Sequence, residues 1–358
     1  MQLLELLYEK EFKNISIIPR KLSIAEDDKV IVCGARGSGK SYLVYDYLQF
    51  ESYGSYLYID FSDFRVEGLS REILQKFCDE KNITTLVLEN FDFSFEPPQV
   101  LKTIITTTAY HEIDGFVTKV LYPLDFEEFI SFDKKFVSEQ TSFNLFSSKG
   151  TYPFVVTSEK DNFEKNFQMM LRAYFKDELE FSLIKELSLK QGSLITLLGL
   201  FKQIKQTNKI SKDKFYTLMQ KLQDEMMIYL LPKYQKNSHK KKLFMIDFAI
   251  RGIVSFEKDF KKRLDSIIFL ELLKKGKEIY YGDRVDFILP ENSLAVTAIP
   301  FLPEGLLRNK IKLIIPHIKD ANLKKLQVIT LDAEFNFQED GVECEVMTFW
   351  SFALGGDL

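Results

Sequence analysis

The sequence lacks the features that mark several large protein classes. Only three of its 358 residues are cysteines and three are histidines, and both types are scattered. An odd number of distant cysteines argues against a disulfide scaffold and favours a reducing compartment, and the histidines lack metal-site spacing. No apolar run approaches the roughly 18 residues of a membrane span, and glutamates near the N-terminus stand where a signal peptide would be basic. We therefore expect a cytoplasmic protein with no membrane partner.

Neither sign of charge dominates the composition. Lys and Arg together number 48 against 52 for Asp and Glu, which gives a net charge of -4. This balance excludes a wholly basic nucleic-acid coat but leaves room for a local basic patch. Hydrophobic residues make up 46% of the chain, which excludes a disordered protein. The length predicts two or three domains.

The N-terminal third alternates between strand and helix patterns. After a lead-in helix and turn within residues 1–28, the helical patterns cover residues 41–49 and 70–81. Short apolar runs predict strands at residues 30–33, 55–60, 84–89, 103–108 and 117–121. Such alternation, with continuous apolar runs, is typical of a parallel α/β sheet covered on both faces.

The rest of the chain changes character. Residues 162–231 are mainly helical, with Ser211 as a predicted N-cap. Two β-prone runs then flank the polar stretch 232–242, which predicts a hairpin and, with the preceding helices, a winged-helix-like module. The last hundred residues return to mixed α and β. There we expect a helix near 264–275 and strands at 278–282, 285–289, 294–299, 312–316 and 327–331.

One motif points to nucleotide chemistry. The residues between the first strand and the next helix satisfy G-x-x-x-x-G-K-[ST] in full, and we expect them, with the following Tyr42, to bind a nucleotide: Gly34, Ala35, Arg36, Gly37, Ser38, Gly39, Lys40 and Ser41. The glycines let backbone N–H groups curl around phosphates, and the helix N-terminus adds partial positive charge. Lys40 is expected to reach the β- and γ-phosphates, and Ser41 to ligate Mg²⁺. The alternative is a chance glycine-rich turn.

A second nucleotide element is expected at the end of the third strand. Glu89 follows an apolar run there and could hold Mg²⁺ together with Ser41, whereas the alternative is that it only ends a strand. The next residue, Asn90, stands where a catalytic glutamate is usual and cannot take a proton. Asp92 is the nearest substitute, so Lys40, Glu89 and Asp92 are the candidate catalytic residues.

Several stretches together resemble one bacterial and archaeal family of AAA-type P-loop ATPases. Its phosphate loop carries an arginine, like Arg36, and five further stretches resemble its motifs in order: 122–129 (YPLDFEEF), 150–153 (GTYP), 242–247 (KLFMID), 265–272 (DSIIFLEL) and 285–287 (VDF), with 347–352 (MTFWSF) at the end. The resemblance implies a P-loop ATPase domain at 1–158, a winged-helix-like helical domain at 159–250 and a restriction-nuclease-like α/β domain at 251–358. It also implies ATP rather than GTP, with Mg²⁺, and leaves a homo-oligomer open.

The nuclease-like part departs from that family. Asp286 and Asp265 match two of its acids, but Ala295 and Thr297 replace the second metal ligand and the lysine. We therefore expect no nuclease activity.

The polar hairpin is a candidate DNA contact. Residues 233–263 hold ten Lys or Arg against three acids, and a winged-helix hairpin would present Lys233, Lys236, Lys240, Lys241 and Lys242. A solvated loop in a lysine-rich protein is the alternative. Two main functions remain: a slow Mg²⁺–ATP-dependent switch, or a DNA-binding module with ATP as a structural ligand.

Overall fold

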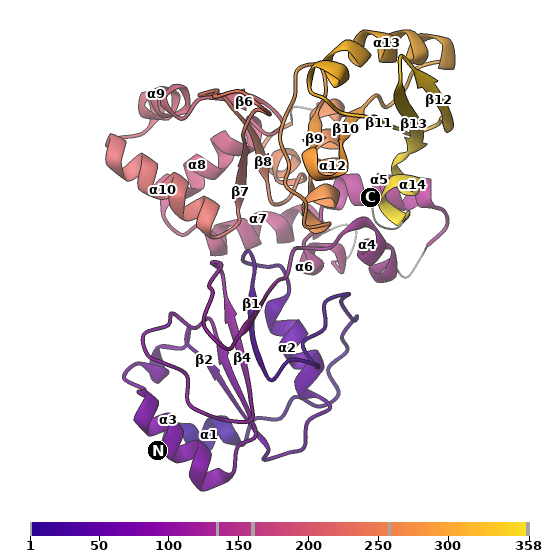
Figure 1. Ribbon diagram of the computed structural model, residues 1–358. Helices are drawn as coiled ribbons and strands as arrows, with labels where there is room; N and C mark the ends of the chain where they lie inside the picture. Colours follow the sequence, from indigo (N-terminus) through magenta and orange to yellow (C-terminus); the bar gives the residue numbers. More distant parts are fainter. Residues whose placement is uncertain (1, 134–135, 159–161, 257–258, 356–358) are drawn as a thin grey trace. The chain divides into compact units, whose positions relative to one another are not determined.

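The computed structural model describes residues 2–133, 136–158, 162–256 and 259–355, and its internal contacts divide the chain into two compact units (Figure 1). The first unit comprises Met1–Pro123 with Asp224–Met226, and the second comprises Leu124–Gln223 with Met227–Leu358. The finer division at residues 158 and 250 stays a prediction. Among the described residues, no helix is long and apolar enough to cross a membrane.

The first unit is built on a five-stranded sheet in which every neighbouring pair of strands is parallel. The strand order is β2-β3-β4-β1-β5. The strands are β1 (Lys29–Cys33), β2 (Tyr56–Asp60), β3 (Thr85–Glu89), β4 (Lys102–Thr107) and β5 (Val117–Val120). Each predicted strand is therefore confirmed to within one residue, and the sheet is consistent with a P-loop NTPase-like core.

Helices cover both faces of this sheet, as the continuous apolar strands require. Apolar residues of α1 (Gln2–Tyr8) and α3 (Arg71–Lys81) pack on one face in a cluster with Ile31, Leu57 and Leu86. Those of α2 (Lys40–Leu48) pack on the other face against Val32 and Val87. The predicted bounds of α2 and α3 are confirmed to within one residue. Alternate residues of each strand thus face α2, and this fixes which side chains reach the loop that precedes it.

The second unit begins with seven helices among its described residues: α4 (Phe126–Phe132), α5 (Glu139–Lys149), α6 (Pro153–Val156), α7 (Phe163–Tyr174), α8 (Glu178–Leu189), α9 (Leu197–Thr207) and α10 (Lys212–Asp224). Ser211 accepts a hydrogen bond from the backbone N–H of Lys214 at 3.2 Å, which confirms it as the cap of α10. A three-stranded antiparallel sheet has the order β6-β8-β7. Its strand β6 (Leu194–Ile195) lies between α8 and α9, and β7 (Ile228–Leu231) and β8 (Lys241–Met245) follow α10. The pairing of β7 with β8 is the hairpin that the sequence predicts.

The C-terminal part of this unit is a mixed five-stranded sheet in the order β12-β13-β11-β10-β9. Its strands are β9 (Phe287–Leu289), β10 (Leu294–Ala298), β11 (Lys325–Thr330), β12 (Phe335–Glu339) and β13 (Val342–Thr348). The helices here are α11 (Ile250–Val254), α12 (Phe260–Lys274), α13 (Glu304–Asp320) and α14 (Phe349–Leu354), and short 3₁₀ turns lie at Phe64–Val66 and Pro290–Asn292.

Two predicted strands of this region are wrong. Residues 312–316 lie inside α13, because Leu307, Ile311 and Ile315 are spaced at helical intervals and pack together in the core of the C-terminal sheet. Residues 278–282 form only isolated bridges, in which Tyr280 pairs with Ile288 and Tyr281 with Lys233. The predicted helix at 264–275 is present as α12 and begins four residues earlier, at Phe260.

Candidate functional site

The loop between β1 and α2 has the backbone that a phosphate cradle requires. Gly37 and Gly39 have φ values of 81° and 101°, a region that other residues rarely adopt. A Cβ atom at Gly34 would collide with the carbonyl oxygen of Leu121. The Ser38 hydroxyl is buried and has no hydrogen-bond partner among the described residues. A curled loop with an unsatisfied hydroxyl fits an oxygen-rich anionic ligand.

Lys40 is the buried cation of this loop. Its side chain is 8% exposed, and Nζ donates hydrogen bonds to the carbonyl oxygens of Gly34 at 2.7 Å and Ala35 at 3.1 Å. Burial lowers the pKa of Lys40 to about 8, and the nearby Glu89 opposes that shift. The ammonium group thus bonds to the carbonyl oxygens of its own loop, and these contacts do not fully offset the cost of burying its charge. A phosphate group beside it would stabilise the charged form.

Ser41 and Glu89 are brought together across the sheet. The Ser41 hydroxyl donates to Oε1 of Glu89, and the Tyr58 hydroxyl donates to Oε2 of the same carboxylate. Burial raises the pKa of Glu89 and also that of Tyr58, whose hydroxyl lies 3.2 Å from that of Tyr45 on α2. These two predicted metal ligands lie side by side, with oxygen donors of the kind that Mg²⁺ prefers. Sequence reasoning missed Tyr58, because only the pairing of β2 with β3 places it there.

The strand end after Glu89 gives Asn90 and Asp92 different surroundings. Asp92 is exposed and accepts a hydrogen bond from the backbone N–H of Ser94 at 3.0 Å. Hydrogen bonds from the side chain and the backbone of Ser94 lower the pKa of Asp92. Asn90 has a φ of 53°, and its side-chain amide donates to Oδ1 of Asp60 at 2.9 Å. Asp60 is therefore a carboxylate at this edge that the sequence analysis overlooked. The available signal was that the second apolar run, like the third, ends in an acid.

The other predicted loop residues occupy the expected segment with different exposure. Ala35 is buried, Arg36 is half-buried, and Tyr42 is 58% exposed on the first turn of α2. The backbone oxygen of Ser38 accepts a hydrogen bond from Arg20 at 2.7 Å. Arg20 also donates to the oxygen of Tyr122 at 2.8 Å, so it links the loop to the segment after β5.

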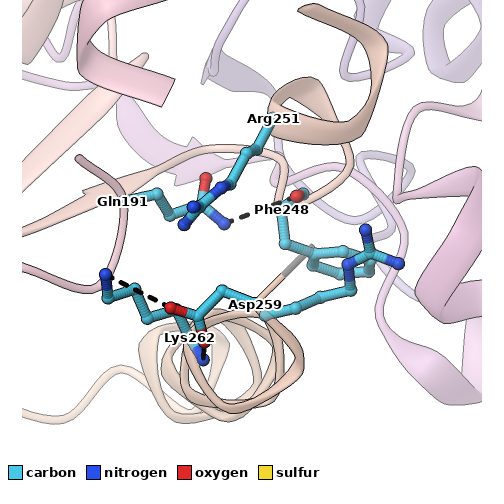
Figure 2. A pocket seen from close by; sticks show the side chains of 6 residues that line it. Gln191, Phe248, Arg251, Asp259 and Lys262 are labelled. Carbon is cyan, nitrogen blue, oxygen red and sulfur yellow. Dashed lines mark hydrogen bonds and ion pairs between the residues drawn. The ribbon is translucent and has the colours of Figure 1, made fainter. Parts of the chain in front are cut away.

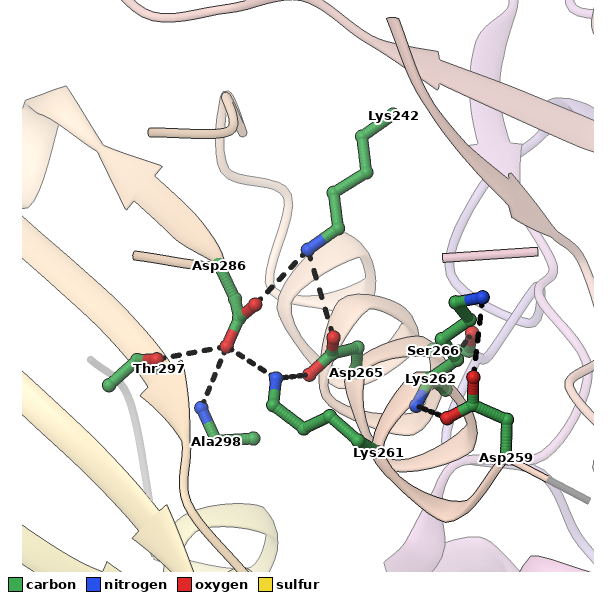
Figure 3. A network of polar contacts seen from close by, with 9 residues as sticks. All are labelled: Lys242, Asp259, Lys261, Lys262, Asp265, Ser266, Asp286, Thr297 and Ala298. Atoms are coloured by element: carbon green, nitrogen blue, oxygen red, sulfur yellow. Dashed lines mark hydrogen bonds and ion pairs between the residues drawn. The ribbon is translucent and has the colours of Figure 1, made fainter. Parts of the chain in front are cut away.

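The two acids of the C-terminal region lie in a closed network with two lysines (Figure 3). Lys261 donates to both Asp265 and Asp286, the latter at 2.8 Å, and Lys242 lies 3.2 Å from Asp286 and 3.8 Å from Asp265. The Thr297 hydroxyl donates to Asp286 at 2.9 Å. The neighbouring cations lower the pKa of Asp286, while burial raises that of Asp265 to about 6.

Aspartates also neutralise much of the basic stretch. Asp283 lies 2.5 Å from Lys233 and 3.2 Å from Lys236, whereas Lys240 and Lys241 make no ion pair with a described residue. Lys262 pairs with Asp259 at 3.2 Å in a small pocket (Figure 2). The pocket is lined by Gln191, Phe248, Arg251, Asp259, Lys262 and Arg263. Lys258 lies outside the described residues. The predicted DNA contact at Lys233, Lys236, Lys240, Lys241 and Lys242 stays a prediction.

Comparison with known proteins gives, among others, the following two likenesses. MJ1544, an uncharacterized protein of Methanocaldococcus jannaschii, is 23% identical over an alignment of 403 residues that covers 95% of this chain and 90% of that protein. The solved structure of the Walker-type ATPase paby2304 of Pyrococcus abyssi aligns with 69% of this chain and 99% of its own, at 12% identity and a TM-score of 0.44. No protein-family model matches the chain. An assignment of function therefore depends on the geometry of the site.

Proposed function

We propose that the chain binds Mg²⁺–ATP at the loop of residues 34–41 and hydrolyses it slowly, as a nucleotide-dependent switch. The observation that carries this proposal is the pairing of Ser41 with Glu89 beside the buried Lys40. A complete phosphate loop, a cation at its centre and a carboxylate against the loop hydroxyl are the parts that nucleotide hydrolysis requires. The choice of ATP over GTP in this proposal is based only on the family resemblance.

Each side chain has a distinct task in this proposal. Lys40 leaves the carbonyl oxygens of Gly34 and Ala35 to neutralise phosphate charge, and the loop N–H groups orient the phosphates. Ser41 and Glu89 would hold Mg²⁺, which supplies charge neutralisation between the phosphate oxygens. Tyr58 keeps Glu89 oriented toward the loop through its hydrogen bond.

Two finer assignments belong to the same proposal. The helices α8 to α10 with the sheet β6-β8-β7 form a winged-helix-like part, supported by their order along the chain and the antiparallel hairpin. The mixed sheet with α12 and α13 is a nuclease-like scaffold without nuclease activity, supported by the lysines that occupy its two acids.

Calorimetry with Mg²⁺–ATP tests the nucleotide site. Lys40→Ala should weaken binding at least tenfold, because the buried phosphates lose their mobile cation. Lys76→Ala, on the exposed side of α3, is the matched control and should bind like the wild type. Equal affinity in Lys40→Ala and wild type, with both folded, would exclude this role for Lys40.

A further inference from the structure

Asp60 and Glu89 occupy the same edge and the same face of the sheet. They are register partners at the ends of the parallel strands β2 and β3, so their side chains project to one side. Tyr58, two residues before Asp60, shares this face and contacts Glu89. This is the face that α2 covers, where Ser41 also reaches Glu89. Asp60 therefore stands on the nucleotide side of the sheet.

Asn90 holds the Asp60 carboxylate in a defined position. Oδ1 of Asp60 accepts the side-chain amide of Asn90 and the backbone N–H of Ser62, both at 2.9 Å. The backbone N–H of Asn90 is itself fixed by the Thr106 hydroxyl at 3.0 Å. No described residue donates a hydrogen bond to the other oxygen, Oδ2, and Asp60 is only half-buried. One carboxylate oxygen is thus oriented and the other is available to a water molecule.

We propose that Asp60 is the general base for ATP hydrolysis in this chain and that Asn90 positions it. The inference rests on the proposed function. Water attacks the γ-phosphorus, a new P–O bond forms, and the bond from the γ-phosphorus to the bridging oxygen breaks to release ADP. The proton of the attacking water passes to Oδ2 of Asp60 and then to solvent. The Asn90 amide thereby positions the base, and the Asp60 carboxylate accepts the proton. A single glutamate after β3 would do both.

The other carboxylates of this edge are already engaged. Both oxygens of Glu89 accept hydroxyl hydrogen bonds, from Ser41 and Tyr58. Asp92 forms a local turn with Ser94 and is exposed. Asp60 lies beside Glu89 and has an oxygen that accepts no hydrogen bond from a described residue. We therefore assign the role of general base to Asp60 in place of Asp92, the candidate from the sequence.

Single-turnover hydrolysis by the full chain, measured together with ATP affinity, tests this assignment. Asp60→Asn keeps the size and the hydrogen bond of the side chain but removes its basicity. We expect the rate to fall by about 10²–10⁴-fold, with ATP affinity within about threefold of the wild type. Asp60→Glu, which keeps a carboxylate at this position, should recover part of the rate. Asp114→Asn, an exposed aspartate after β4, is the matched control.

Three outcomes would overturn the assignment, and they differ in what they say of the proposed function. A wild-type rate in Asp60→Asn with normal ATP binding leaves the ATPase proposal standing and removes Asp60 as base. A loss of Mg²⁺–ATP affinity in Asp60→Asn would make Asp60 part of the metal site instead. Absence of ATP binding in the wild type would overturn both proposals.

Discussion

The buried carboxylate of Asp247 accepts two hydrogen bonds from Thr151, one from its backbone N–H at 2.6 Å and one from its hydroxyl at 2.8 Å. The N–H of Ala249 donates to the other oxygen at 2.6 Å. Asp247 has no exposed surface, so these donors replace the water that an ionised carboxylate loses on burial. The end of β8 is thereby attached to the turn after α5, and two of the family-like stretches meet.

Gly150, the residue before Thr151, has no room for a side chain. Its φ is 82°, and a Cβ atom there would collide with both carboxylate oxygens of Asp247. We expect Gly150→Ala to cost about 3 kcal/mol or more, since backbone strain of roughly 1–2 kcal/mol adds to overpacking of roughly 1–3 kcal/mol. Urea unfolding followed by the fluorescence of Trp350, the single tryptophan, measures this.

Gly341→Ala is the matched control for this prediction. Gly341 has a φ of 80° and lies in the same unit, but a Cβ there would meet nothing within 4 Å. It should therefore lose only about 1–2 kcal/mol of backbone strain. Equal losses at the two glycines would show that the turn relaxes away from Asp247.

The aspartate–lysine network should be sensitive to the loss of one cation. Lys242 is 8% exposed, and its replacement by Met leaves the buried Asp265 and the half-buried Asp286 with only Lys261 as a neighbouring cation. Breaking a buried ion pair typically costs about 3–5 kcal/mol, so Lys242→Met should lower the free energy of unfolding by roughly that amount. Adding Asp265→Asn should recover part of the lost free energy of unfolding, because the double variant removes one positive and one negative charge from the network.

Lys240→Met serves as the control for the network. Lys240 lies two residues away, is exposed and makes no ion pair with a described residue, so the change should stay within about 0.5 kcal/mol. If Lys242→Met were equally mild, the carboxylates would have another source of compensation, such as protonation of Asp265.

The same network leads us to expect no cleavage of single- or double-stranded DNA with Mg²⁺ or Mn²⁺. Lys242 and Lys261 already neutralise Asp265 and Asp286, and Thr297 stands where the family resemblance would place the lysine of a nuclease. A nuclease assay of wild type and Asp286→Ala checks this, and both should be inactive. Cleavage by the wild type that disappears in Asp286→Ala would show a working metal site.

Local patterns predict the first unit well, because its strands are continuous apolar runs and its phosphate loop is one contiguous motif. They fail where two periods compete: the run at 312–316 has apolar residues suited to a strand, yet Leu307, Ile311 and Ile318 extend a helical stripe beyond it. Pro316 lies inside that helix, although proline disfavours the interior of a helix. Tertiary packing therefore overrides the local signal here.

The candidate site shows the same limit. Gly34 to Ser41 are readable from spacing alone, whereas the roles of Tyr58 and Asp60 depend on the register of β2 against β3. Parallel register depends on how the buried faces of both strands pack in the sheet, so no short motif within one strand reveals it. The neutralisation of Asp286 likewise comes from lysines on β8 and α12, which no short motif connects to it.

The pKa of Lys40 leads to a pH-dependent prediction for nucleotide binding. Burial lowers this pKa to about 8 in the free protein, and phosphate charge beside the ammonium should raise it again. ATP binding should therefore take up a proton when the pH is above about 8, and affinity should fall as the pH rises through that value. Calorimetry at pH 8.5 in buffers of different ionisation enthalpy should show net proton uptake, larger than the uptake at pH 7.

Lys40→Arg separates this effect from other titrating groups. Arginine stays charged at these pH values, so this variant should bind ATP, more weakly because of its different shape, without proton uptake near pH 8.5. Lys76→Met, exposed on α3, should keep the uptake of the wild type. An uptake that persists in Lys40→Arg would assign the proton to another group. A wild type with no uptake would mean that Lys40 is already fully charged in the free loop, held there by Glu89 against the cost of its burial.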